Sequence, residues 1–147
     1  MKIGIASDHW GYDKKDKLKT YLSRKGIDVK DYGTNSTEIT DFPQYAFALG
    51  EAVVKKDVDY GIVICSTGIG ISIAANKVKG LRCYKLNTAL EAKLSKNHND
   101  ANMIAFGRKT MMFLIKDMVD IFLKTEVSAK KRYENRNLQI KEYESKK

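Results

Sequence analysis

The residues best suited to chemistry lie in the stretch "YGIVICSTGIGISIAANK", residues 60 to 77. An apolar strand pattern there meets a glycine-rich turn and then a helix, and Cys65 stands where the strand ends. Small residues at Thr67, Gly68 and Gly70 allow backbone N–H groups to face an anion near the positive end of a helix. A phosphate, a carboxylate or an enolate oxygen would suit such a pocket.

Cys65 has two interpretations. A cysteine at a strand end is more often a small buried hydrophobic residue than a reactive one. A thiol beside a helix N-terminus has its thiolate stabilised, however, which suits a base or a nucleophile. The turn is not a P-loop, because no Lys-Ser or Lys-Thr pair follows its second glycine, and it lacks the third glycine of the dinucleotide fingerprint. The two glycines could also serve only to permit a tight turn.

The chain has only two histidines, His9 in "SDHWG" and His98 in "KNHNDAN". Each has a carboxylate beside it in the sequence and falls near a predicted strand end or loop, which favours acid and base roles. We expect both at the same edge of the sheet as Cys65. Asn99 and Asp100 make the second segment unusually polar for a solvent loop, although helix capping would also explain it.

Two arginines near the C-terminus could bind an anion. Arg132 and Arg136 lie four residues apart, so on a helix their guanidinium groups would share one face and could clamp a phosphate. Exposed helix arginines are the default alternative.

The elements that must position these residues follow a simple alternation. The hydrophobic pattern predicts five strands, at 2–7, 27–33, 59–65, 81–86 and 102–107. Helices are predicted between and after them, over 12–25, 43–56, 71–77, 88–97 and 111–124. This order predicts a Rossmann-like α/β fold, a five-stranded parallel sheet in a three-layer α/β/α arrangement, with ligands beyond the carboxyl ends of the strands.

Length and composition indicate one domain over residues 1–147, with a helical tail from about residue 125. That tail is highly charged and has few apolar residues, so it either docks as a helix on a partner subunit or frays. No apolar run approaches the roughly 20 residues of a membrane helix, and the opening residues lack the features of a signal peptide, so we expect a soluble cytoplasmic protein without membrane partners. Cys65 and Cys83 lack zinc-site spacing, and we expect neither a metal nor a disulfide.

The formal net charge of +9 is compatible with nucleic acid, an anionic small substrate or a lysine-coated surface. The lysines are scattered among acidic residues and form no stripe interleaved with aromatic residues, which an RNA-binding surface would need. A binding protein for nucleotides or nucleic acid therefore stays the alternative from another class, and an enzyme is favoured.

Taken together, the stretches "SDHWGYDKK", "DYGT", "DFPQYA", "ICSTGIGISIAANK" and "HNDAN" resemble the type B ribose-5-phosphate isomerases and their relatives, the galactose-6-phosphate isomerase subunits. The resemblance covers nearly the whole chain. It implies an aldose–ketose isomerase of phosphorylated sugars that uses no cofactor and forms a homodimer with active sites at the subunit interface, further assembly into a tetramer being left open.

The resemblance also implies a role for each matching residue. Cys65 would move a proton between C2 and C1 through an enediolate, and the backbone around Thr67, Gly68 and Gly70 would hold the oxyanion. His98, with Thr67, would assist opening of the sugar ring, and Asp8 would position the sugar. The remaining substrate contacts would be His9, Ser66, Asn99, Lys109, Arg132 and Arg136, with the two arginines reaching from the other subunit.

Four positions depart from the family pattern. Trp10 stands where alanine is usual, and Lys109, preceded by Arg108, stands where many members have arginine. Tyr133 replaces a histidine, and Lys79 replaces a proline. Lysine cannot reproduce the bidentate fork of arginine. These departures leave the choice of sugar open between ribose 5-phosphate, which the resemblance favours, and six-carbon substrates such as galactose 6-phosphate or allose 6-phosphate.

Overall fold

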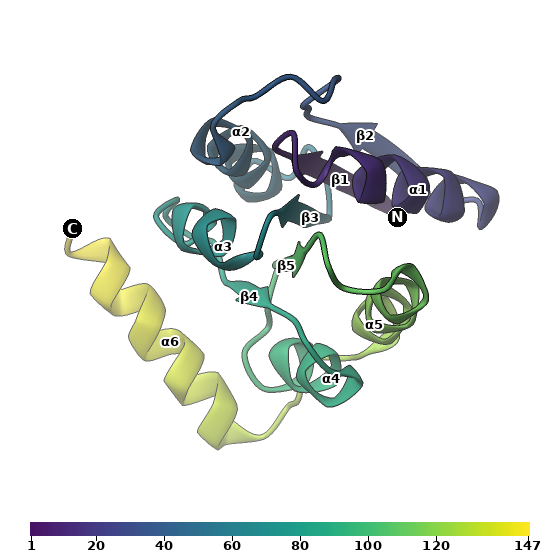
Figure 1. Ribbon diagram of the computed structural model, residues 1–147. Coiled ribbons are helices and arrows are strands. Elements are labelled where there is room, and N and C mark those ends of the chain that lie inside the picture. The colour runs from purple at the N-terminus through teal and green to yellow at the C-terminus, as the bar shows by residue number, and fades with distance from the viewer.

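Five parallel strands form the centre of the computed structural model, which describes residues 1–147 (Figure 1). Their spatial order is β2-β1-β3-β5-β4, so the chain passes over β1 between β2 and β3 and over the position of β5 between β3 and β4. This confirms the predicted α/β class. The strands are β1 (Lys2–Ser7), β2 (Asp28–Asp31), β3 (Tyr60–Cys65), β4 (Cys83–Lys85) and β5 (Met103–Gly107).

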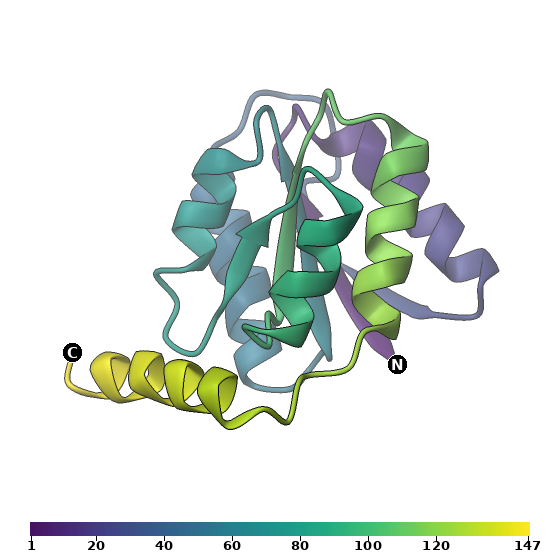
Figure 2. The same cartoon turned by 90° about the horizontal axis from the view of Figure 1, so that it is seen from below.

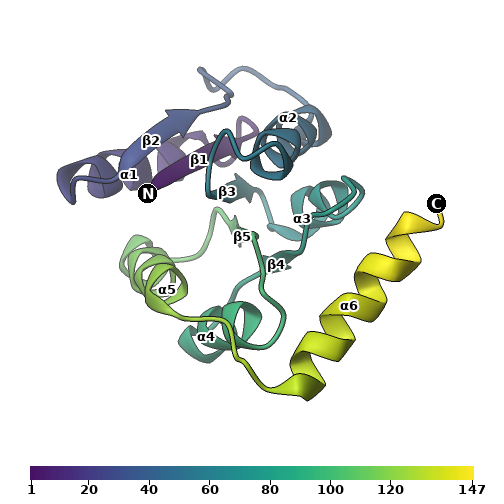
Figure 3. The same ribbon diagram turned by 180° about the vertical axis from the view of Figure 1, so that it is seen from behind.

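Helices cover both faces of the sheet, and Figure 3 shows the same layers from behind. One face carries α1 (Tyr12–Arg24), α4 (Ala89–Asn97) and α5 (Met112–Lys124). The other face carries α2 (Phe42–Val54) and α3 (Ile69–Ala75). No helix in the structure is both long enough and apolar enough to span a bilayer.

The central strands alternate their side chains between the two layers, as a strand must. In β3, Ile62 and Ile64 pack with the helices of one face, whereas Val63 and Cys65 pack with those of the other. Both sets are buried, which explains why the strand reads as a continuous apolar run in the sequence. Cys65 therefore ends a fully covered strand, with its backbone fixed at the carboxyl edge of the sheet.

The glycine-rich turn differs from its prediction in one respect. Helix α3 begins at Ile69 and not at residue 71, so Gly70 lies inside its first turn. A Cβ on Gly70 would come within 2.6 Å of the Phe42 ring, so packing requires a residue without a side chain here. Gly68 has φ of 79° and precedes the helix, a conformation that favours glycine.

The last helix, α6 (Lys131–Ser145), has no buried residue. Figure 2 shows it beyond the end of the sheet at which the N-terminus lies. Its hydrogen bonds to the rest of the chain are few: Glu144 accepts one from the Gly80 N–H (3.1 Å), and the Asn137 side chain donates one to the His98 carbonyl (3.0 Å). Apolar side chains remain exposed along it, namely Leu138, Ile140 and Tyr143.

Candidate active site

A pocket of about 490 Å³ lies at the carboxyl edge of the sheet, where the ends of β1 and β3 meet the start of α2. This is the edge at which ligands gather in open parallel sheets. Several residues predicted from the sequence come together here. The lining includes Asp8, His9, Trp10, Thr40, Asp41, Phe42, Cys65, Ser66, Thr67 and Gly70.

Cys65 lies at the floor of this pocket with only 3% of its surface exposed. Its Sγ accepts a hydrogen bond from the Gly68 N–H at 3.1 Å, and the Thr67 hydroxyl accepts one from the Ile69 N–H at the same distance. The left-handed conformation of Gly68 turns its N–H back toward the sulfur. A backbone donor is therefore directed at the sulfur that faces the pocket.

Cys83 is a different kind of thiol. It packs against the core beneath α2 and α3, and burial raises the pKa of its thiol far above the usual range. Its sulfur therefore stays protonated and unreactive.

Asp8 is 4% exposed and lines the same pocket. Burial raises the pKa of its carboxyl above the usual value, although a hydrogen bond from the Gly11 N–H (3.1 Å) and the charge of His9 act in the opposite direction. The cost of burying this carboxylate is only partly offset by its hydrogen bond and by the charge of His9. A carboxylate of this kind that faces a pocket is typical of a functional site.

His9 is oriented by a loop that sequence reasoning did not single out. Its Nδ1 lies 3.2 Å from the Thr40 N–H, which donates to it, and 3.1 Å from the Thr40 carbonyl. The Thr40 hydroxyl in turn lies 3.0 Å from the Tyr45 hydroxyl. These contacts leave Nε2 of His9 free for a ligand. The motif "DFPQYA", which follows Thr40 directly, was the available signal for this loop.

A second, strongly basic pocket of about 290 Å³ adjoins the first, since Ser66 and Thr67 line both. It has no hydrophobic and no acidic lining residue. Its other walls come from Lys85 and from the turn after β5, namely Gly107, Arg108, Lys109 and Thr110. Lys109 is exposed there, as expected of a residue that could meet an anion from solvent.

The prediction that His98 shares an edge with Cys65 is wrong within one chain. The segment from His98 to Asn102 precedes β5, and the Asn102 carbonyl accepts a hydrogen bond from the Gly61 N–H at the start of β3. Cys65 pairs with Gly107 at the other end of the same two strands. In a parallel sheet, residues before a strand lie at the amino edge and residues after it at the carboxyl edge, which is the reason for the error.

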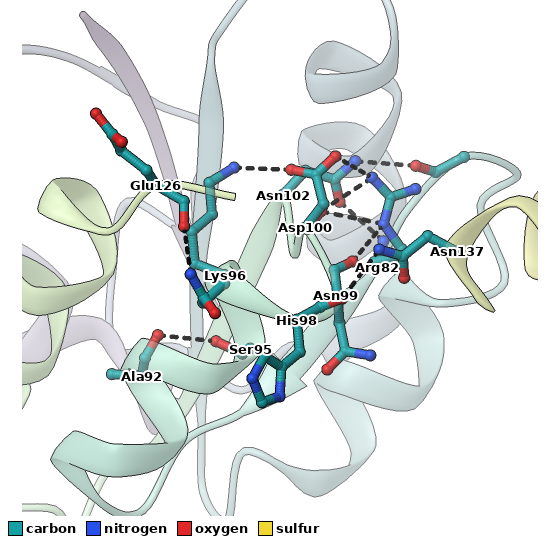
Figure 4. Close-up of polar contacts among 12 residues, drawn as sticks. Arg82, Ala92, Ser95, Lys96, His98, Asn99, Asp100, Asn102, Glu126 and Asn137 are labelled. Atoms are coloured by element: carbon teal, nitrogen blue, oxygen red, sulfur yellow. Dashed lines mark hydrogen bonds and ion pairs between the residues drawn. The ribbon is translucent and has the colours of Figure 1, made fainter. Parts of the chain in front are cut away.

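Much of the polar character of this segment is structural (Figure 4). Asp100 forms ion pairs with Lys96 (2.9 Å) and Arg82 (3.1 Å). The Asn102 side chain accepts from the Arg82 N–H and donates to the Gly80 carbonyl. These bonds explain Asp100 and Asn102 as residues that fix the loop before β5.

The side chains of His98 and Asn99 make no hydrogen bond within the chain, and they are therefore free for a ligand. The His98 ring stacks on Tyr133 of α6, with the ring centroids 4.0 Å apart. Arg132 also lies against Tyr133 and donates to its hydroxyl at 2.9 Å, whereas Arg136 is exposed. His98, Asn99 and both arginines thus gather near the base of α6, apart from the pocket of Cys65.

No three His, Cys, Asp or Glu side chains come together in an arrangement that could hold a metal ion. The pocket of Cys65 offers a thiol, carboxyl groups and an imidazole, and the adjoining pocket offers basic side chains.

Comparison with known proteins is consistent with this chemistry. A family model described as Ribose/Galactose Isomerase matches residues 3–140. Ribose-5-phosphate isomerase B of Escherichia coli is 44% identical over 83% of each chain. The structure of ribose-5-phosphate isomerase B from Clostridium thermocellum matches with a TM-score of 0.96 and 44% identity over 99% of both chains.

A further solved structure carries a ligand. It is ribose-5-phosphate isomerase B from Mycoplasma genitalium with bound ribulose-5-phosphate, which is 34% identical, covers 99% of this chain and 97% of its own, and has a TM-score of 0.93. Family match, relatives and fold agree over nearly the full length. The chain belongs to the ribose/galactose isomerase family and is a sugar-phosphate aldose–ketose isomerase.

Proposed function

We propose that this protein interconverts ribose 5-phosphate and ribulose 5-phosphate, with Cys65 as the base. The observation that carries the proposal is the buried Sγ of Cys65, which faces the pocket and accepts the Gly68 N–H at 3.1 Å. The bound ribulose-5-phosphate of the Mycoplasma genitalium structure supports the choice of a five-carbon substrate.

The chemistry follows from a thiolate beside an open-chain sugar. Cys65 removes the proton from C2, the electron pair forms the C1–C2 double bond, and the C1 carbonyl oxygen becomes the oxyanion of an enediolate. The thiol then returns the proton to C1, and the carbonyl forms at C2 as the proton on O2 moves to O1. Backbone N–H groups at Thr67, Gly68 and Gly70 stabilise the oxyanion, while Asp8 holds the sugar hydroxyls.

The other proposed contacts need a second copy of the chain. Within one protomer His98 lies at the amino edge of the sheet, whereas Cys65 lies at the carboxyl edge. We therefore place His98 of one protomer, together with its Asn99, Arg132 and Arg136, in the site that contains Cys65 of the other. His98 assists ring opening with Thr67, and the arginines bind the phosphate together with His9, Ser66 and Lys109. A homodimer is the smallest assembly that completes the site.

The test compares ribose 5-phosphate, galactose 6-phosphate and allose 6-phosphate as substrates for the wild type and for Cys65→Ala. We expect the largest kcat/KM with ribose 5-phosphate, and a loss of roughly 10²- to 10⁴-fold in the variant, the range for removal of a general base. Cys83→Ala is the matched control, because Cys83 lines neither pocket of the candidate site. Preference for a six-carbon substrate would refute the choice of sugar, and an active Cys65→Ala would refute the base.

A further inference from the structure

Arg108 lies against the face of Trp10 at the rim of the candidate site. Its guanidinium carbon is 4.1 Å from the centre of the indole ring, within the range of a cation–π contact. The Trp10 ring in turn lies 5.0 Å from the imidazole of His9, tilted by 38°. Arginine, tryptophan and histidine therefore form a continuous row of flat side chains, and the last two line the pocket of Cys65.

Arg108 has no acidic partner. No carboxylate lies within ion-pair distance of its guanidinium, and its Nε is buried without a hydrogen-bond acceptor. The basic pocket that it lines also contains Lys85 and Lys109 and no acidic residue. An arginine fork without a partner, next to two lysines, is an arrangement that an anion completes, because a phosphate can accept two parallel hydrogen bonds from the fork.

The backbone fixes Arg108 relative to the proposed base. Its N–H donates to the carbonyls of Cys65 (2.9 Å) and Ser66 (3.1 Å). The turn that follows is anchored to α1, because Lys14 donates from Nζ to the Thr110 carbonyl at 2.6 Å. The backbone of Arg108 is thus tied directly to the backbone of Cys65 and Ser66.

We propose that Arg108, held flat by Trp10, binds the phosphate group of the substrate, with Trp10 as the residue that positions it. The inference rests on the proposed function for the identity of the substrate, but its chemistry requires only a phosphate group. It assigns to Arg108 the bidentate contact that the neighbouring Lys109, an exposed ammonium group, cannot make. The phosphate then lies where the two pockets meet, beside Ser66 and Thr67.

Binding of inorganic phosphate tests this without turnover. Calorimetry gives Kd for the wild type, Arg108→Ala and Arg108→Lys, with Arg24→Ala as the control because Arg24 is an exposed arginine without a partner at the C-terminal end of α1. We expect Kd to rise roughly 10- to 100-fold in Arg108→Ala, because the variant loses charged hydrogen bonds to the phosphate. Kd should rise by less in Arg108→Lys, which keeps the charge. Arg24→Ala should bind as the wild type does.

Trp10 offers a second readout, since it is the only tryptophan in the chain. Phosphate and ribose 5-phosphate should change its fluorescence at the concentrations at which calorimetry detects binding, and ribose without phosphate should not. If Trp10 positions Arg108, Trp10→Ala weakens phosphate binding several-fold and Trp10→Phe, which keeps an aromatic face, restores most of it.

A Kd for phosphate that is unchanged in folded Arg108→Ala would overturn the inference, as would a wild type that binds no phosphate. These results are distinct from failure of the proposed function. A protein that binds phosphate through Arg108 but does not isomerise ribose 5-phosphate would keep this inference and lose the proposed substrate. If the protein isomerises ribose 5-phosphate normally and Arg108→Ala leaves KM unchanged, the proposed substrate stands and this inference is refuted.

Discussion

At the scale of the residue, the candidate site contains two buried polar side chains whose surroundings differ. Cys65 is buried beside a backbone donor, whereas Asp8 is buried with too little compensation, and burial raises the pKa of its carboxyl. Buried groups of this kind lower stability and are kept where they serve binding or catalysis. We therefore expect Asp8 to oppose folding at neutral pH.

Asp8→Asn tests this expectation. A raised pKa means that the folded state disfavours the charged carboxylate, so the cost is absent below the usual value of 3.8 and complete above the folded-state pKa. Asparagine keeps an oxygen for the Gly11 N–H. The variant should melt at a higher temperature than the wild type at pH 7, with the difference vanishing below about pH 3.8, and should lose activity roughly 10- to 100-fold. A variant that melts lower at pH 7 would contradict the account.

Some of the site could be foreseen at this scale. The residues of the glycine turn and of "SDHWG" fall together in the structure because each directly follows a central strand. The contact of Arg108 with Trp10 could not be foreseen, since it joins residues that are distant in the sequence and depends on side-chain direction. Thr40 was missed for the same reason, since only the folded loop brings it to His9.

At the scale of the element, the loop that carries Thr40 is held by a buried ion pair. Lys15 on α1 is 1% exposed and donates to Asp31 (2.7 Å) and to the Thr34 carbonyl (2.6 Å). Burial alone would raise the pKa of Asp31, but hydrogen bonds from Lys15 and the Gly33 N–H outweigh it and hold the pKa below the usual range. The pair links α1, the end of β2 and the start of the loop.

Lys15→Met should therefore be strongly destabilising. It leaves Asp31 charged and partly buried with only the exposed Lys19 nearby, and removal of one partner of a buried pair costs about 3–5 kcal/mol. The stability that the pair provides is present above the usual Asp pKa and is lost as pH falls through the lowered folded-state value. Urea unfolding should show a large gap between wild type and variant at pH 7 that narrows in acid. A gap that stays constant with pH would argue against the ion pair as its cause.

The element pattern was the most predictable part of the fold. Every predicted strand and helix exists, because buried parallel strands and amphipathic helices have distinct hydrophobic periods. The start of α3 was misplaced by two residues, since Gly70 resembles a turn residue in sequence and is needed for packing against Phe42. The His98 segment lies at the amino edge, opposite to the prediction, because it precedes β5 and does not follow a strand of the sheet.

At the scale of the whole molecule, the residues that we propose to act on the substrate lie in two separate groups on one protomer. Cys65 and its neighbours lie at the carboxyl edge of the sheet, whereas His98 stacks on Tyr133 of α6, the helix that also carries Arg132 and Arg136. Helix α6 has no buried residue and exposes Leu138, Ile140 and Tyr143, and α3 exposes Ile69 and Ile73. In the homodimer that we propose, a second copy covers these apolar side chains and brings the two groups of residues together.

The most direct measurement of this central claim is complementation between two inactive variants. The Cys65→Ala and His98→Ala chains, which we expect to be inactive alone, each receive a different affinity tag and are co-expressed. The mixed dimer is isolated through both tags and assayed with ribose 5-phosphate. If each site takes Cys65 from one protomer and His98 from the other, the mixed dimer has one intact site of two and should reach about half of the wild-type activity. If both residues act within one protomer, the mixed dimer has no intact site, and activity that stays at the level of the single variants would contradict the account.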